Sequence, residues 1–579
     1  MERRLLLVFA LTFLVIMLFQ PILRKYGPQP PVPKPESSQM APAQNPAQPP
    51  MPAASGVGPV PAEKKSGGKN EPTTPVSREA ASESETVIEN SLYRIVFTNR
   101  GGRVKSWVLK KWDDEKGRPL ELVNSAAAEK YGYPLSLWTY DENLRNKLNS
   151  ALYVATSTGS TAPAELTFEY ADGDLAVRKS YKFDHNYVVD VRTSVQVQGA
   201  EVTAFPMWPA GFGDATSGPA YAATQIAYQY DSKVERLAIK KVSGGGTLPG
   251  PFHWAGLSDQ YFAAAFIPQD PQNSAMLTLH NTIEIPHKAS DPNNKQMDKV
   301  DVLGSGVASL KGATATRLYV GPKALADLQS VPVPGITGAD PDLRAIVDFG
   351  WLGYIARPLF LWLKWTYSHI VANWGWAILL QTVIINVALL PLRLTQMKSM
   401  LKMQRVAPQI KAIQEKYKKY SLRDPKKAEM NQEISALYKK EGVNPAGGCL
   451  PMLIQMPFLF AYYRMLGVAM DLRHAPWLWV RDLSAPDPYY ILPIAIVITM
   501  FFMQRMTPQA GMDPAQQKMM NFMMPAVLGY ISVNLAAGLC LYWSVGNLIG
   551  IVQQAVMNRT ALGREMREMM EKRARKKEK

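Results

Sequence analysis

The sequence predicts an α-helical integral membrane bundle of six transmembrane helices that carries an all-β sandwich domain outside the membrane. An apolar run fills residues 5–23, close to the N-terminus. Apolar residues then alternate with polar ones from about residue 86 to about residue 320, as in half-buried strands. The C-terminal part consists of long apolar runs that are joined by basic loops. A chain of 579 residues has room for both parts.

Residues 1–26 are expected to form an N-terminal transmembrane anchor. The run at 5–23 is long enough to cross about 30 Å of hydrocarbon at about 1.5 Å per residue. A cleaved signal peptide is the alternative, but the run is longer than a typical signal core and lacks a small-x-small cleavage site. Arg3 and Arg4 precede it, so we expect the N-terminus in the cytoplasm.

Residues 27–85 are rich in Pro, Ala and Ser and are expected to be a linker on the outer side. Residues 86–335 form the predicted sandwich, in which LYRIVFTN at 92–99 ends in a turn at Arg100-Gly-Gly. The triple glycine at 244–246 is not followed by Gly-Lys-Ser/Thr, so a hairpin tip is favoured over a phosphate loop. The two cysteines and six histidines show neither a disulfide framework nor metal spacing, so no metal or cofactor is expected.

Residues 345–372 are apolar and aromatic but interrupted by charges, which predicts an amphipathic helix in the membrane interface. A second span follows at 373–392, and residues 393–447 form a basic cytoplasmic segment. There, apolar residues at helical spacing and a helix start at Asp424-Pro425 predict a helical hairpin. Its apolar seam should contain Val406, Ile410, Ile413, Tyr417, Ile434, Leu437 and Tyr438.

Residues 448–557 contain four more apolar runs, and residues 558–579 form a basic cytoplasmic tail. Six spans place both termini in the cytoplasm and agree with the charge of every loop. The net charge of +16 is therefore explained largely by membrane topology, and nucleic acid stays a secondary interpretation.

Amide side chains inside the spans are candidates for a functional site. Counting from the cytoplasmic ends at 1.5 Å per residue, Asn386 and Gln455 both lie about 9 Å deep, and Asn547 lies near the midplane. Polar groups in a span usually face protein or water, so one interpretation is a polar indentation that opens inward. Ordinary hydrogen bonding between helices, worth about 0.6 to 2 kcal/mol, is an equally good explanation at this stage.

Five motifs resemble the YidC/Oxa/Alb family of membrane protein insertases, in the long form of bacteria with two membranes. They are NWGW at 373–376, NPAGGCLPMLIQMP at 444–457, DPYYILP at 487–493, DPAQQK at 513–518 and GLCLYWSVGNL at 538–548. Together with the anchor and the sandwich they cover nearly the whole chain, in one order.

The resemblance implies an insertase and chaperone of the inner membrane with a periplasmic sandwich and a five-helix core. A hydrophilic groove in the core would open to the cytoplasm, receive nascent hydrophobic proteins and release them laterally into lipid. It implies no enzymatic activity, and as partners the lipid bilayer, the Sec translocon and the ribosome, with the basic tail as a possible rRNA contact. The protein would act as a monomer or weak oligomer.

By motif position, Thr382, Tyr542 and Trp543 match residues that the family uses in the second and last spans. One departure stands out: where the family has an arginine four residues after that threonine, this chain has Asn386. Arg393 lies seven residues further on, nearly on the same helix face. We therefore expect Arg393 to supply the missing charge.

Two other classes of protein fit less well. A polytopic solute transporter is the alternative, but no inverted repeat and no chain of ionisable residues crosses the predicted bundle. An intramembrane protease would need an aspartate pair, a metal motif or a serine with a base, and the spans offer none.

Overall fold

The computed structural model describes residues 77–230, 233–287, 296–336, 341–420, 424–443, 450–506, 519–560 and 564. Contacts divide the chain into a unit of residues 1–71 and a unit of residues 72–579, and all described residues belong to the second. The predicted anchor and nearly all of the predicted linker lie outside the described residues.

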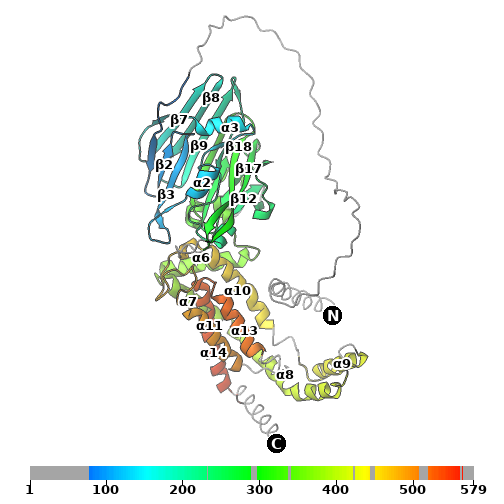
Figure 1. Ribbon diagram of the computed structural model, residues 1–579. Coiled ribbons are helices and arrows are strands. Elements are labelled where there is room, and N and C mark those ends of the chain that lie inside the picture. Colours follow the sequence, from blue (N-terminus) through cyan, green and yellow to red (C-terminus); the bar gives the residue numbers. More distant parts are fainter. Residues whose placement is uncertain are drawn as a thin grey trace, which may run out of the picture. The chain divides into compact units, whose positions relative to one another are not determined.

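Residues 85–322 form three antiparallel sheets that pack into a β-sandwich (Figure 1). The smallest contains, in order, β1 (Glu85–Glu89), β2 (Tyr93–Thr98), β3 (Arg103–Asp113) and β4 (Pro119–Glu121). The five-stranded sheet contains β14 (Gly246–Pro249), β17 (Ser274–Pro286), β18 (Met297–Ser309), β11 (Phe205–Trp208) and β5 (Leu137–Trp138). The ten-stranded sheet contains β13 (Lys233–Leu237), β12 (Gln225–Tyr230), β15 (Trp254–Ser258), β16 (Phe262–Pro268), β19 (Thr314–Pro322), β9 (Val188–Val197), β8 (Leu175–Phe183), β7 (Ala164–Asp172) and β6 (Val154–Ser157), with β10 (Ala200–Glu201) beside β9.

The alternation in the sequence explains these strands. Along β8 every second side chain is buried, beginning with Leu175, and the intervening ones are exposed or half-buried. Large aromatic side chains fill the space between the sheets, and the rings of Trp107 and Trp208 lie 6.0 Å apart. The predicted β-sandwich is confirmed.

The sandwich also contains four short helices that the sequence did not predict. They are α2 (Ser125–Tyr131), α3 (Glu142–Ser150), α4 (Gly218–Ala222) and α5 (Leu325–Gln329). The carboxylate of Asp141 caps α3 by accepting from the backbone N–H groups of Asn143 and Leu144. Helices this short show too few turns for an apolar period to be visible in the sequence.

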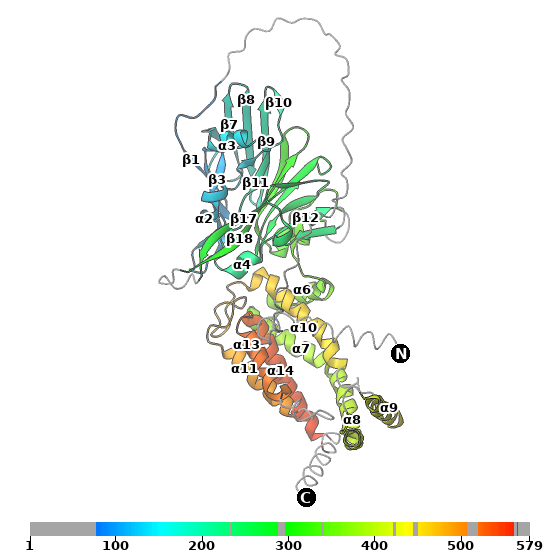
Figure 2. The ribbon, with the colours of Figure 1, turned by 45° about the vertical axis from the view of Figure 1, so that its right-hand side comes forward.

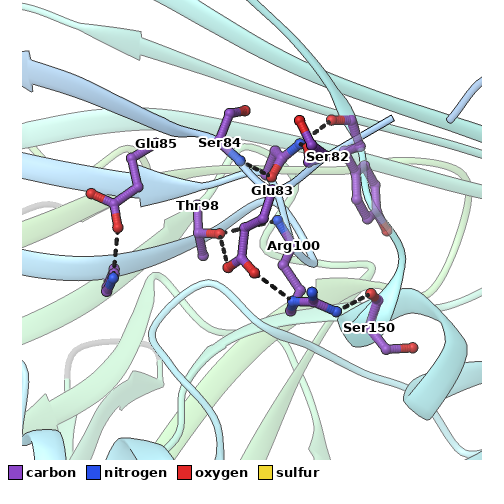
Figure 3. A network of polar contacts seen from close by, with 10 residues as sticks. Ser82, Glu83, Ser84, Glu85, Thr98, Arg100 and Ser150 are labelled. Carbon is purple, nitrogen blue, oxygen red and sulfur yellow. Dashed lines mark hydrogen bonds and ion pairs between the residues drawn. The ribbon is translucent and has the colours of Figure 1, made fainter. Parts of the chain in front are cut away.

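Polar contacts connect the start of the sandwich to α3 (Figure 3). Glu83 accepts a hydrogen bond from Thr98 and pairs with Arg100, each at 3.0 Å. Arg100 also donates to the backbone carbonyl of Ser150, the last residue of α3. The hydrogen bonds from Arg100 and Thr98 lower the pKa of Glu83.

A lysine lies inside the sandwich. Lys179 on β8 is 0% exposed, and its ammonium donates to the backbone carbonyls of Gly101, Gly102 and Leu135 at 2.7, 3.0 and 2.8 Å. Gly101 and Gly102 form the turn between β2 and β3 with φ of 72° and 52°, where glycine is favoured. Burial lowers the pKa of Lys179 well below its ordinary value. The three carbonyls provide one acceptor for each N–H of the ammonium.

The second buried lysine of this domain, Lys323, should make the stability of the folded protein depend on pH. Lys323 donates to the carbonyl of Asp259 at 2.6 Å, and burial lowers its pKa from 10.5 to about 8. Between these values the unfolded chain holds a proton that the folded chain has released, so stability rises with pH. The wild type should gain about 2 kcal/mol relative to Lys323→Met between pH 8 and 10. Thermal unfolding of the two full-length proteins in detergent measures this difference, and a flat difference across this range would contradict it.

Residues 353–559 are mainly helical (Figure 2). The elements are α6 (Gly353–His369), α7 (Trp374–Ala388), α8 (Leu390–Lys416), α9 (Pro425–Lys440), α10 (Leu450–Val468), α11 (Ile491–Met506), a π-helical turn (Met519–Met523), α13 (Met524–Ser532) and α14 (Ala537–Arg559). Within the described part of the chain, α14 is the one helix that is long enough and apolar enough in composition to cross a membrane. Three shorter apolar helices accompany it, at Trp374–Ala388, Ile491–Met506 and Met519–Ser532.

The predicted helical hairpin forms between α8 and α9. Asp424 caps α9 and Pro425 begins it, as the sequence predicted. The seam of the hairpin is an apolar cluster of Val406, Ile410 and Val443, with Met403, Ile434, Leu437 and Tyr438 packed against it. One boundary differs from the prediction: α8 begins at Leu390, inside the predicted second span, with Pro391 in its first turn. The end of the span and the first hairpin helix are therefore one helix.

The sandwich contacts the helical region through loops. Gln260 donates to the carbonyl of Gly467 at the end of α10, with a distance of 2.9 Å. The guanidinium of Arg473 lies over the rings of Tyr261 and Phe262, 5.6 and 5.4 Å from their centroids. These contacts position the end of α10 against the sandwich.

Candidate functional site

The candidate site begins with α7, whose N-terminus is packed tightly. The side chain of Asn373 caps the helix by accepting from the N–H groups of Gly375 and Trp376, and its amide donates to the carbonyl of Pro476. An added Cβ at Gly375 would lie 2.1 Å from Trp477 Cδ1. The loop between α10 and α11 therefore rests directly on the first turn of α7, and only glycine fits at that contact.

Halfway along α7, buried hydrogen bonds connect three helices, and a ring contact adds a fourth. Tyr462 on α10 donates to Gln381 Oε1 at 2.7 Å, and Gln381 donates to the carbonyl of Leu359 on α6 at 3.0 Å. The ring of Tyr462 stacks on that of Tyr542 on α14, with centroids 4.1 Å apart and planes inclined by 16°. Sequence reasoning included Tyr542 but missed Gln381 and Tyr462. Gln381 is an amide in an apolar run, so the rule that selected Asn386 could have found it.

Thr382 and Asn386 lie one turn apart on α7, and both are buried. The Thr382 hydroxyl donates to the carbonyl of Ile378, and the Asn386 amide donates to the carbonyl of Thr382 at 2.8 Å. Gly546 on α14 faces them, since a Cβ there would lie about 4 Å from both side chains. The helix backbone thus satisfies both donors, and Asn386 Oδ1 remains as an acceptor for another group.

Arg393 provides that group. Its Nη2 donates to Asn386 Oδ1 at 3.0 Å, and its Nη1 donates to Gln553 Oε1 on α14 at 2.8 Å. The amide of Gln553 in turn donates to the backbone carbonyl of Asn386 at 3.3 Å. Three residues from α7, α8 and α14 therefore form one closed polar cluster, which we call the Arg393 cluster (Arg393, Asn386 and Gln553).

The other predicted site residues are placed elsewhere. Asn547 donates to the hydroxyl of Thr499 on α11 at 3.3 Å, so it connects α14 to a different neighbour. Trp543 is half-buried against the apolar core. Gln455 belongs to α10, but its side chain lies outside the described residues. The structure thus brings Arg393 and Asn386 into direct contact and places Thr382 beside them, while the side-chain amide of Asn547 bonds to α11.

The charge of Arg393 has no counterpart in the cluster. No carboxylate in the part of the chain that the structure describes forms an ion pair with Arg393. The described residues also contain no group of three or more His, Cys, Asp or Glu that could hold a metal ion. The cluster is therefore a half-buried cation surrounded by neutral amides, an arrangement suited to binding a negatively charged or strongly polar group.

A β-sandwich joined to a bundle of apolar helices is the architecture of a membrane protein with a folded domain beside the bilayer. Residues 85–362 match the family described as the YidC periplasmic domain, and residues 365–564 match the 60Kd inner membrane protein family. The membrane protein insertase YidC of Syntrophus aciditrophicus is 33% identical over 580 residues, which cover 97% of this chain and 100% of the relative. That of Geobacter metallireducens is 33% identical over 519 residues, or 85% of this chain and 88% of the relative.

The chain belongs to the YidC family of membrane protein insertases, which are not enzymes. The resemblance found in the sequence motifs is confirmed. Among solved structures, a crystal structure of an active YidC insertase with its first transmembrane domain is 19% identical and covers 84% of this chain and 95% of its own, with a TM-score of 0.34. The YidC structure from Thermotoga maritima is 13% identical and covers 82% of this chain and 99% of its own, with a TM-score of 0.25.

Proposed function

We propose that the protein receives nascent hydrophobic segments in a hydrophilic groove open to the cytoplasm and releases them laterally into the inner membrane. The observation that carries this proposal is the Arg393 cluster, a charged and hydrogen-bonding group among apolar helices. Thr382, Asn386 and Arg393 would line the groove together, with Gln455, Asn547, Tyr542 and Trp543 as further lining residues.

The mechanism requires no covalent chemistry. A polar tail that enters bare hydrocarbon leaves its hydrogen-bonding groups unsatisfied, at a cost of several kcal/mol for each group. Amides and a guanidinium in the groove would offer partners to such a tail and lower this barrier. Burial of the substrate's own apolar segment in lipid, at about 25 cal/mol per Å², would then drive insertion.

The proposed topology has six spans, both termini in the cytoplasm and the sandwich in the periplasm. Within it α6 lies in the outer interface, and large side chains along its length support this placement. Trp351 just before α6 is 80% exposed, and Tyr354, Leu361 and Trp365 are also exposed. Arg464 near the end of α10 pairs with Asp348 in the connector before α6, and this pair supports an outer-side position for the charge of Arg464.

We also propose that the insertase works alone or beside the Sec translocon, as a monomer or weak oligomer, and that the basic tail contacts the ribosome. The tail lies almost entirely outside the described residues. Depletion of the protein tests its general role, because loss of an insertase should strand many unrelated membrane proteins in the cytoplasm. Loss of transport of a single solute, with normal membrane insertion, would contradict the proposal.

Arg393 is the proposed charge of the groove in place of the family's arginine, since its guanidinium hydrogen-bonds the side chain of Asn386. Arg393→Gln should reduce the insertion of a substrate with an acidic translocated tail about tenfold, because a charge-assisted hydrogen bond is lost. Insertion of the same substrate with glutamines in the tail should change little. Both are measured by protease protection in vesicles that contain the full-length protein.

The chain offers a direct control for this experiment. Asn386→Arg in the Arg393→Gln background returns a cation to the position that the family uses, and it should restore insertion of the acidic tail. Unchanged insertion in Arg393→Gln, or equal losses for acidic and neutral tails, would show that Arg393 does not act through its charge.

A further inference from the structure

The guanidinium of Arg393 packs against α14 at two residues. Gln553 provides an amide that binds it, and Gly550 has no side chain that would collide with it. Gln553 accepts from Arg393 Nη1 through Oε1 and donates to the carbonyl of Asn386 through Nε2, at 2.8 and 3.3 Å. It therefore uses both ends of its amide, one on α8 and one on α7. Neither a hydroxyl nor a carboxylate offers this combination of donor and acceptor in the same geometry.

Gly550 provides the space, one helical turn before Gln553 on α14. A Cβ added at Gly550 would lie 3.0 Å from Arg393 Nη1 and 2.8 Å from Met503 Sδ. Both distances are shorter than ordinary van der Waals contacts, so a side chain at this position would displace the guanidinium or the thioether. The missing side chain at Gly550 thus makes room for the guanidinium of Arg393 and for the thioether of Met503.

The surroundings of the Arg393 guanidinium are unusual for an arginine that only stabilises a fold. A partly buried guanidinium that only stabilises a fold is normally paired with a carboxylate, because an unpaired charge in a low-dielectric interior is costly. Here the partners of Arg393 are two neutral amides, and no carboxylate in the described portion of the chain pairs with it. Gln553 holds the guanidinium in place but leaves its charge uncancelled.

We propose that Gln553 and Gly550 are positioning residues that hold Arg393 with its positive charge uncompensated, so that an acidic group of the substrate can supply the missing partner. This inference rests on the proposed insertase function. It adds a charge requirement to the hydrogen-bonding one: the residue at position 553 must be neutral as well as able to accept from Arg393 and donate to the carbonyl of Asn386. A glutamate there could still accept from Arg393, but it would neutralise the site.

Gln553→Glu is therefore the decisive variant, and Gln554→Glu is its matched control. Gln554 is the next residue on α14, and its amide donates to Asn558 instead of contacting Arg393. Full-length variants in lipid vesicles are compared on one substrate with an acidic translocated tail and on the same substrate with glutamines in the tail. Gln553→Glu should reduce insertion of the acidic tail about tenfold. It should leave the neutral tail unchanged, and Gln554→Glu should insert both tails as the wild type does.

The outcomes separate this inference from the proposed function. If Arg393→Gln reduces insertion of the acidic tail and Gln553→Glu does not, the positioning role of Gln553 is wrong, while the role of Arg393 stands. If neither variant affects the acidic tail, the proposed charge of the groove fails as well. Equal losses on both tails in Gln553→Glu would indicate a structural defect and would also overturn the inference.

Gly550→Ala provides a second, independent readout. Alanine has a higher helix propensity than glycine by about 1 kcal/mol, so a purely structural view expects α14 to be unharmed or stabilised. The positioning role proposed for Gly550 instead predicts that insertion of the acidic tail is lost selectively. The added Cβ would lie 3.0 Å from Arg393 Nη1 and would push the guanidinium away from Gln553. If Gly550→Ala inserted the acidic and neutral tails in the same ratio as the wild type, the positioning role of Gly550 would be wrong.

Discussion

Replacement of Lys179 by methionine is expected to lower the free energy of unfolding of the sandwich by about 3 to 5 kcal/mol. Methionine fills a similar volume, but it leaves the carbonyls of Gly101, Gly102 and Leu135 without their donor. Each buried carbonyl that loses its partner costs about 1 to 3 kcal/mol, and local relaxation recovers part of the sum. Since whole domains are stable by about 5 to 15 kcal/mol, this single change should be severe.

Thermal or urea unfolding of the full-length protein in detergent measures this loss. Lys182→Met is the matched control, because Lys182 lies on the same strand but points outward and pairs with Glu165 on the surface. That exposed pair should contribute less than about 1 kcal/mol. If the two variants were equally stable, the hydrogen bonds of Lys179 would not contribute to the stability of the domain.

Gly375→Ala is expected to have the second largest effect, on the packing of the loop between α10 and α11. The new methyl group would overlap the Trp477 ring, which has an edge-to-face contact with Trp376 and lies beside Trp479. Overpacking of this kind typically costs about 1 to 3 kcal/mol. Because Trp477 is buried, with 7% of its surface exposed, we expect the loop to be displaced from the start of α7.

A lower midpoint of thermal unfolding and faster proteolysis within residues 470–488 would show this displacement. Gly467→Ala is the control, since no atom lies within 4 Å of the Cβ position at Gly467. Alanine should be tolerated there or should be slightly stabilising, because Gly467 lies in the helix α10. Equal stability of Gly375→Ala and the wild type would mean that the tryptophan moves freely, contrary to its packing.

The sandwich could be predicted from sequence because its signal is local. A period of two appears within a few residues, and the turn at Arg100-Gly-Gly marks where β2 ends and β3 begins. The same alternation contains Lys179 at an inward position of β8, between Val177 and Tyr181. A buried lysine could have been inferred from that parity, but its three carbonyl partners come from distant loops and needed the tertiary structure.

The candidate site was predictable within one continuous stretch of the chain, across the junction of α7 and α8, and not between distant helices. Helical spacing placed Arg393 on the face of Asn386, about 10 Å further along, and a flexible arginine side chain covers that distance. Gln553 and Gly550 come from a helix more than 150 residues later, and no local pattern in the sequence distinguishes Gln553 from Gln554. The six spans and the roles of the groove residues stay predictions.

The contact between Arg393 and Asn386 changes how related sequences should be compared with this one. A comparison made one position at a time would record a neutral amide at position 386 and would not connect it with Arg393. In three dimensions the guanidinium of Arg393 lies 3.0 Å from the side-chain oxygen of Asn386, so a positive charge lies beside position 386 although residue 386 is neutral. Within this chain, the small residue at position 550 is part of the same arrangement, because a Cβ there would lie 3.0 Å from Arg393 Nη1. Positions 386, 393 and 550 should therefore be compared together, as one three-dimensional unit, when this sequence is set beside others.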